Sequence, residues 1–323
     1  MLFPVAGVEV APWLPILAGF TIALFCSMGG VAGANLVLPF QMSVLGFVTP
    51  AVTPTNHLYN LVAVPVGVYR YIREGRMVWP LTWVVIAGTV PGVLLGVVLR
   101  VKYLHNPVAF KLFAGLVLLS IGYLMVRSLV KSDALKSGKG SSEKRFQELV
   151  AKRRKNKRSG CTEDASEKEK LPQVVVEHFG LRSIDYTFCG ENISAPTIGI
   201  FSLSAIVGII GGIYGIGGGS IIAPFFVAVF HLPVYTIAGA CLMGTFLTSF
   251  TATIMFQVVS FYQANTTVAP DWLLGGMLGL GGMIGMYSGA RLQKHVRAKL
   301  IKWILTFIVF FAGGRYVVGY FIS

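Results

Sequence analysis

Polar side chains stand inside the apolar runs of this chain, and the types of seven of them suit the binding of an anion. They are Asn35, Asn56, His57, Asn60, Ser220, Cys241 and Thr245. Amides, hydroxyls and a weak thiol donor can supply hydrogen bonds to the oxygens of a sulfonate or a carboxylate. We expect the nearby Thr248 and Ser249 to bond back to the carbonyl four residues earlier instead.

Two glycine-rich stretches must position these side chains. Six glycines fall between Gly211 and Gly219, and Met28–Asn35 is a weaker version of the same pattern. Glycine weakens a helix interior by about 1 kcal/mol relative to alanine, so each stretch predicts a broken helix. Close packing of small residues between helices is the alternative interpretation. Broken backbone in lipid is tolerated where it lines a cavity or is buried in protein, so the predicted binding residues also include Gly33, Ala34, Gly218 and Gly219.

The composition indicates a membrane protein. Of 323 residues, 54% are hydrophobic and 12% charged, which predicts an all-α polytopic membrane protein. Residues 1–13 lack the basic start of a cleaved signal peptide. The four cysteines form no Cys-x-x-Cys pair, and the glycines lack the lysine of a Walker A loop and the third glycine of a dinucleotide fingerprint. We therefore expect no cofactor, no metal site and no enzymatic activity.

Five apolar segments occupy each half of the chain, and the halves resemble one another. The first five are residues 13–30, 36–48, 51–71, 78–99 and 108–130, and the second five are 197–214, 220–230, 235–261, 272–291 and 299–322. Pro39 matches Pro224 at an offset of 185, and Gly88 matches Gly281 at an offset of 193. This predicts a duplication of two membrane units, residues 1–130 and 197–323, joined by a charged insert at 131–196.

Loop charges predict that the two units are inverted. Three arginines follow the third segment of the first unit, whereas residues 260–271 of the second contain no lysine or arginine. The connection after the fourth segment carries Arg291, Lys294, Arg297, Lys299 and Lys302 in the second unit, against Arg100, Lys102 and Lys111 in the first. The positive-inside rule then places both termini outside and residues 131–196 in the cytoplasm. Each unit must cross the membrane five times, or three times with a re-entrant first pair.

Helix N-termini and the scarcity of acidic residues favour an anionic ligand. Asn35 and Ser220 open short segments after the glycine breaks, where free N–H groups and the helix dipole attract anions. Outside residues 131–190 the carboxylates are Glu9, Glu74, Glu191 and Asp271, and none falls in the middle of an apolar run. An acidic lining usually marks a cation site. The two breaks therefore predict an anion site built from half-helices, a pattern typical of secondary transporters.

The charged insert changes character along its length. Residues 152–158 form a basic run, which either attracts anionic lipid head groups or, as we favour, is a solvated charge block. One short tract does not indicate nucleic-acid binding. Ser183–Phe188 alternates like a half-buried strand, with Val174–Val176 as a hairpin partner. We attach no function to the glycosylation patterns at Asn192 and Asn265.

The glycine motifs resemble those of the TauE/SafE sulfite exporter family, also called toluene sulfonate uptake permeases. The similarity lies in Gly212–Pro224, its partner Gly29–Pro39, and Gly289–Leu292. It covers both membrane halves. The resemblance implies an inner-membrane transporter of sulfur-containing anions such as sulfite, sulfoacetate or sulfonates. The insert is longer than expected for the family.

We therefore expect secondary transport of a small sulfur-containing anion by alternating access. His57 is the only histidine inside an apolar segment; it either carries a coupled proton or is a packing residue. The alternatives are a membrane-embedded enzyme and a permease subunit of an ATP-driven complex. The expected partners are the anion and the lipid bilayer, and a homodimer stays open.

Overall fold

The structure is a computed structural model that is mostly helical. It describes residues 1–29, 32–75, 77–134, 175–180, 182–188, 191–230, 232–262, 267–292 and 298–322. The first-half helices are α1 (Trp13–Gly29), α2 (Ala34–Ser43), α3 (Val52–Ala63), α4 (Pro65–Arg73), α5 (Trp79–Lys102) and α6 (Pro107–Ala134). The second-half helices are α8 (Thr197–Tyr214), α9 (Gly218–Ala228), α10 (Val234–Tyr262), α11 (Trp272–Leu292) and α12 (Ala298–Ile322).

These helices confirm the apolar segments expected from the sequence, with one difference. The segment at residues 51–71 is two helices, α3 and α4, because Pro65 stands at the first position of α4. Proline lacks the N–H that would continue the hydrogen bonds of α3, although Val64 before it keeps helical backbone angles. Its fixed φ suits the start of a new helix.

Five of the described helices are long and apolar enough to cross a membrane. They include residues 79–102, 107–127, 197–214, 236–262 and 300–321. Large apolar side chains on these helices are exposed, among them Trp83, Phe250 and Phe307. Exposed apolar surface of this extent is typical of a lipid contact. The chain is therefore a multi-pass membrane protein.

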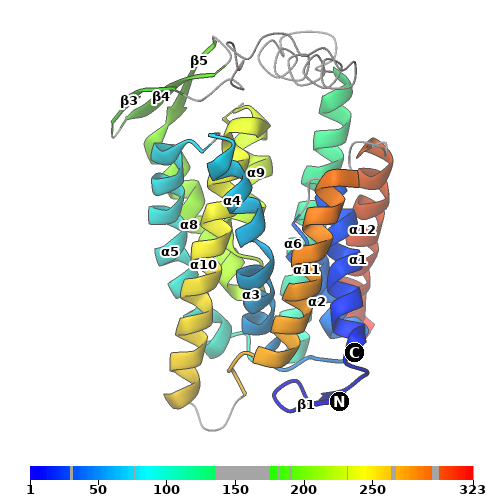
Figure 1. Cartoon of the computed structure of the whole chain (residues 1–323). Coiled ribbons are helices and arrows are strands. Elements are labelled where there is room, and N and C mark those ends of the chain that lie inside the picture. Colours follow the sequence, from blue (N-terminus) through cyan, green and yellow to red (C-terminus); the bar gives the residue numbers. More distant parts are fainter. Residues whose placement is uncertain are drawn as a thin grey trace.

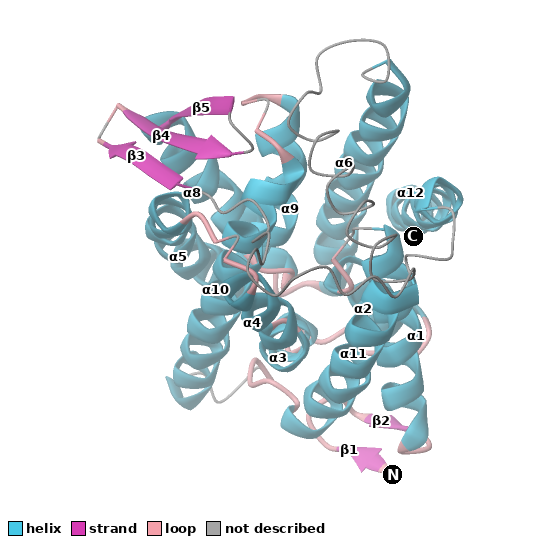
Figure 2. Ribbon diagram, turned by 45° about the horizontal axis from the view of Figure 1, so that its top comes forward, coloured by secondary structure: helices cyan, strands magenta, loops and turns pink. Residues whose placement is uncertain are grey.

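Helices from the two halves of the sequence pack side by side. α1 packs along α11, and α5 packs along α8. In the same way α3 packs against α11, and α10 against α5. α6 pairs with α12, as Figure 2 also shows. Neither half of the chain therefore forms a separate bundle.

The two ends of the molecule carry different small sheets. The N-terminus, the C-terminus and the hairpin of β1 (Leu2–Phe3) and β2 (Val8–Glu9) lie at one end, which we call the terminal end (Figure 1). A sheet of β3 (Val175–Phe179), β4 (Ser183–Phe188) and β5 (Glu191–Pro196) lies at the other, the sheet end. Its strands are antiparallel, with Val175 opposite Thr187 and Ile184 opposite Ala195.

This sheet confirms the strand and hairpin expected within the insert. β4 alternates between half-buried and buried side chains, as its sequence pattern predicts. The hydroxyl of the buried Tyr186 lies 2.9 Å from Thr236 Oγ1, so the sheet is joined to the start of α10. Burial raises the pKa of Tyr186 to about 12, which keeps this phenol neutral at physiological pH. The basic run at 152–158 lies outside the described residues.

In each half of the chain, the first and the third helix begin at the same end of the molecule. Asp271 joins Ala6, just before α1, to Thr55 at the start of α3: its Oδ2 accepts from Ala6 N at 3.1 Å, and its N–H donates to Thr55 Oγ1 at 2.9 Å. Hence α1 and α3 both begin at the terminal end. α8 follows β5 directly and α10 begins at Thr236's contact with the sheet, so both begin at the sheet end.

Candidate functional site

The second glycine stretch forms a sharp break between α8 and α9. α8 ends at Tyr214, and α9 begins at Gly218. Gly215 and Gly217 have φ values of 92° and 79°. Only glycine adopts such angles without strain, because a Cβ would clash with the backbone. The expected broken helix is therefore present, and its glycines are required by the turn itself.

The first glycine stretch separates α1 from α2. Residues 30 and 31 lie outside the described part of the chain, and α2 begins at Ala34. Gly33 precedes it beside the Tyr59 hydroxyl, where an added Cβ would lie only 2.3 Å from the oxygen. The N–H groups of Leu36 and Val37 bond back to the Gly33 carbonyl at 3.0 Å. Some of the amides at this helix start are therefore already occupied.

A single side chain of α3 holds both breaks together. The Asn56 amide nitrogen donates to the Ala34 carbonyl at 3.1 Å and to the Gly215 carbonyl at 3.0 Å. The Tyr214 hydroxyl donates to the Asn35 carbonyl at 3.3 Å, which joins the breaks a second time. Asn56 is fully buried. The two glycine stretches, about 180 residues apart in sequence, therefore meet at one place.

The neighbouring turn of α3 fixes the backbone of the second break. Asn60 Nδ2 donates to the Ile216 carbonyl at 2.7 Å, and Thr53 Oγ1 donates to the Ile213 carbonyl at 3.2 Å. Buried carbonyls without a partner cost free energy, and these side chains supply the partners that the broken helix lacks. Asn56 and Asn60 thus use their donors on the protein. Their direct binding of a ligand remains a prediction; for Asn56, whose amide nitrogen already makes two contacts, the ligand would have to replace one of them.

His57 lies on the side of α3 that faces α10. Its Nδ1 lies 3.3 Å from Ser249 Oγ, and its ring lies beside Phe256. We expected the Ser249 hydroxyl to bond to the carbonyl four residues earlier, but it lies beside His57 instead. Thr248 confirms the expectation, with its hydroxyl 2.6 Å from the Gly244 carbonyl. That hydroxyl also accepts from the N–H of Gly218, at 3.3 Å.

The remaining predicted residues lie where α9 begins against α10. A Cβ on Gly219 would lie 1.8 Å from the Cys241 carbonyl oxygen, so the two helices touch through backbone. The Thr245 hydroxyl donates to that same carbonyl at 2.9 Å. Cys241 is a buried free thiol. Ser220 belongs to the first turn of α9, and its side chain lies outside the described part of the structure.

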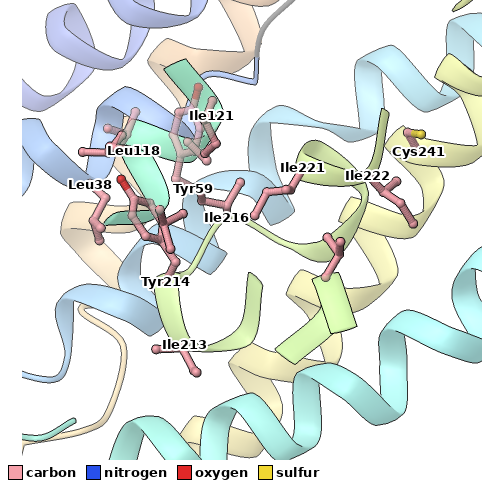
Figure 3. Close-up of a cluster of buried hydrophobic side chains, with 14 of the residues drawn as sticks. Leu38, Tyr59, Leu118, Ile121, Ile213, Tyr214, Ile216, Ile221, Ile222 and Cys241 are labelled. Atoms are coloured by element: carbon pink, nitrogen blue, oxygen red, sulfur yellow. The ribbon is translucent and has the colours of Figure 1, made fainter. Parts of the chain in front are cut away.

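Several buried polar atoms around the breaks have no hydrogen-bond partner. They are Asn35 Oδ1, Gln41 Oε1, His57 Nε2 and the Tyr59 hydroxyl. Buried polar groups are normally paired, so a group of unpaired ones requires an explanation such as a ligand or water. The Tyr59 side chain belongs to a buried, largely apolar cluster, in which Leu38, Tyr59, Tyr214 and Ile216 lie together (Figure 3).

Sequence reasoning missed three residues of this region. Tyr59 lies within the polar cluster that contains Asn56 and Asn60, and Gln41 is a polar residue in a short apolar segment; both signals were available. Gln41 Nε2 donates to Asn56 Oδ1 at 3.3 Å. Arg100 corrects an expectation, because it is fully buried in the last turn of α5 rather than exposed in a loop. It therefore does not count among the loop charges that predict orientation.

Acidic side chains are scarce near the breaks. Asp271, at the start of α11, is buried and accepts from the N–H of Leu274 at 2.9 Å, so it caps that helix at the terminal end. Among the described residues there is no group of three or more histidine, cysteine, aspartate or glutamate side chains that could hold a metal ion. In the part of the chain that the structure describes, the predicted binding residues at the breaks offer amides, a hydroxyl, a thiol and an imidazole, and no carboxylate.

Comparisons with known proteins agree with a membrane transporter. A 117-residue part of the chain is 26% identical to the probable membrane transporter protein YunE of Bacillus subtilis (strain 168). That match spans 36% of this chain and 40% of the Bacillus protein. No solved structure matches. The model of the sulfite exporter TauE/SafE family matches residues 15–316, nearly the whole chain. The chain therefore belongs to the TauE/SafE family.

Proposed function

We propose that the protein carries a small sulfur-containing anion across the membrane by secondary transport. The anion is a sulfonate such as sulfoacetate, or sulfite. The observation that carries the proposal is the meeting of two broken helices at Asn56, beside buried polar atoms that have no protein partner. Half-helices that meet at membrane depth are typical substrate sites of transporters. The family's name supports the class of substrate.

Paired helix contacts support two inverted repeats. Cβ atoms added to Gly88, Gly92 and Gly96 of α5 would strike the carbonyls of Phe201, Ala205 and Ile209 in α8. The equivalent glycines of α11 meet carbonyls of α1 at Ile16, Phe20 and Leu24. The two carbonyl sets differ by 185 residues, the same offset that relates Pro39 to Pro224. α1 begins at the terminal end and α8 at the sheet end (Figure 1), and these opposite directions support the proposal that the repeats are inverted.

The same pairing supports alternating access by two groups of helices. The first group is α1, α3 and α11, and the second is α8, α10 and α5, each built from both repeats. The groups meet where α3 packs on α10, next to the breaks. In our proposal they rock against each other, so that the site opens first to the terminal end and then to the sheet end. The terminal end faces outside and the sheet end faces the cytoplasm, as the loop charges predict.

The binding residues of the proposal are those predicted from the sequence. The starts of α2 and α9 supply Gly33, Ala34, Asn35, Gly218, Gly219 and Ser220; α3 and α10 supply Asn56, His57, Asn60, Cys241 and Thr245. In the proposal His57 carries the coupled proton, and its place where α3 packs on α10, between the two groups of helices, supports this role. We do not include a homodimer, because nothing in the single chain or the comparisons supports one.

Binding to the purified chain tests the proposal. Sulfite, sulfoacetate, taurine and thiosulfate are titrated against the parent protein, Ser220→Val and Asn35→Leu. We expect the parent to bind at least one anion and both variants to bind it more weakly. Ser120→Val, an exposed change on α6, is the matched control. Equal binding by the parent and both variants excludes the site at the helix starts.

Uptake into liposomes separates the other functions. Transport by the lone chain, without ATP, excludes a permease subunit that depends on an ATPase. Conversion of the anion into a product, assayed in detergent, would instead indicate an enzyme. We expect uptake and no product.

A further inference from the structure

Arg100 is a buried cation inside a membrane helix. Its side chain is 0% exposed and is the largest fully buried one among the described residues. A buried charge costs much free energy unless an opposite charge compensates it. Arg100 makes no ion pair with any carboxylate in the part of the chain that the structure describes. Its charge is therefore not balanced by this part of the protein.

Neutral groups hold the guanidinium in place. Arg100 Nε donates to Thr53 Oγ1 at 3.0 Å, and Nη1 donates to the Leu104 carbonyl. The ring of the buried Phe110 lies 3.7 Å from the guanidinium carbon, a cation–π contact. The third nitrogen, Nη2, is buried and has no partner. Nε and Nη1 of the guanidinium are thus held by the protein, whereas Nη2 remains available to a hydrogen-bond acceptor.

Thr53 connects Arg100 to the second break. Its hydroxyl accepts from Arg100 and donates to the Ile213 carbonyl at 3.2 Å, two residues before Gly215. Its own carbonyl would lie 2.6 Å from a Cβ added to Gly215, so Thr53 packs directly on the break. Four residues earlier, in the loop before α3, Thr49 Oγ1 is another buried atom without a partner. Since α3 begins at the terminal end, Arg100 lies between that end and the breaks.

We propose that Arg100 binds the transported anion on its way between the terminal end and the helix breaks. Nη2 donates a charge-assisted hydrogen bond to an oxygen of the anion, and the anion neutralises the buried guanidinium. Such bonds are about twice as strong as neutral ones. The residue then favours substrates with net negative charge, a dianionic sulfonate above a zwitterionic aminosulfonate. This inference rests on the proposed transport of a sulfur-containing anion.

Thermal unfolding in detergent tests the role of Arg100. The parent, Arg100→Gln, Arg100→Lys and Lys102→Gln are titrated with sulfoacetate, a dianion, and with taurine, a zwitterion. Lys102 is the matched control, since it is exposed and two residues away on the same helix. Ligand that binds only the folded state stabilises it by RT ln(1 + [L]/Kd), so Tm rises once the ligand concentration exceeds Kd. Fitting the rise in Tm to this relation gives, for each ligand, the concentration at which half of the folded protein is occupied, and this midpoint is the readout.

We expect Arg100→Gln to shift the sulfoacetate midpoint about tenfold or more, and the taurine midpoint much less. The midpoints of Lys102→Gln should equal those of the parent. Without ligand, Tm of Arg100→Gln should not fall, because an unbalanced buried charge has been removed. A fall in ligand-free Tm with an unchanged sulfoacetate midpoint would instead show that Arg100 only anchors the start of α3, and would overturn the inference.

Two further outcomes are distinguishable. If Arg100→Gln does not fold, Arg100→Lys keeps the charge but lacks the planar guanidinium and its Nη2 donor; a weakened affinity for sulfoacetate supports the inference, and an unchanged affinity overturns it. If the parent responds to none of sulfite, sulfoacetate, taurine and thiosulfate, the proposed transport itself fails. If sulfoacetate stabilises the parent and Arg100→Gln equally, the proposed transport stands and only the role of Arg100 in anion binding is refuted.

Discussion

The Tyr214 hydroxyl donates to the Asn35 carbonyl at 3.3 Å, and so joins the last residue of α8 to the first turn of α2. Each residue borders one of the two glycine breaks, and both are buried. The bond couples the two broken helices directly. Any movement that separates α2 from α8 during transport must break it.

The contribution of this hydrogen bond to stability can be measured by comparison with a matched substitution that removes no hydrogen bond. Tyr214→Phe should lower the free energy of unfolding by about 1 kcal/mol, since it leaves the Asn35 carbonyl without this donor. Tyr59→Phe should leave stability unchanged, because the Tyr59 hydroxyl has no partner in the structure. Unfolding of both variants in detergent checks the difference. Equal stability of the two variants would contradict a role for the bond in holding the breaks together.

The contact of Gly219 with Cys241 should not tolerate a methyl group. A Cβ at Gly219 would lie 1.8 Å from a backbone oxygen, so Gly219→Ala must push α9 away from α10. Overpacking of this kind costs about 1–3 kcal/mol, and we expect anion uptake to be lost. Gly276→Ala is the control, because nothing lies within 4 Å of its Cβ and alanine favours helix. Liposome uptake by Gly219→Ala at the level of Gly276→Ala would refute close packing at this point.

Proton coupling is expected to depend on His57. In His57→Ala, a pH gradient should no longer drive uptake of the anion into liposomes, while exchange of labelled for unlabelled anion continues. The exposed His105→Ala should behave as the parent in both assays. Uptake driven equally by the gradient in His57→Ala would assign the proton to another group.

The orientation in the membrane can be tested by chemical labelling. Single cysteines are introduced at Leu2, at Tyr320 and at Tyr69 in a background without the natural cysteines. All three positions are exposed. A membrane-impermeant maleimide applied to intact cells should label the first two, which lie at the terminal end, and Tyr69 only after permeabilisation. The reverse pattern would invert the predicted topology.

The sequence by itself determined the helices and the existence of the breaks. Apolar runs of membrane-spanning length leave the backbone no alternative to helix in lipid, so α8 begins and ends at the expected residues, Thr197 and Tyr214. The glycines between Gly211 and Gly219 predicted a break for the same local reason. Alternation of side chains predicted β4. Each of these features depends on residues close together in the chain.

The tertiary structure alone decided which groups are occupied and which remain open. Asn56 and Asn60 were predicted as ligand groups from their type, but their amides hold carbonyls of the breaks, the one at Ala34 included. Arg100 was counted as a loop charge because it stands at the end of an apolar run, yet α5 carries it into the protein beside Thr53. Burial and hydrogen-bond partners depend on helices far apart in the sequence. No local pattern contains that information.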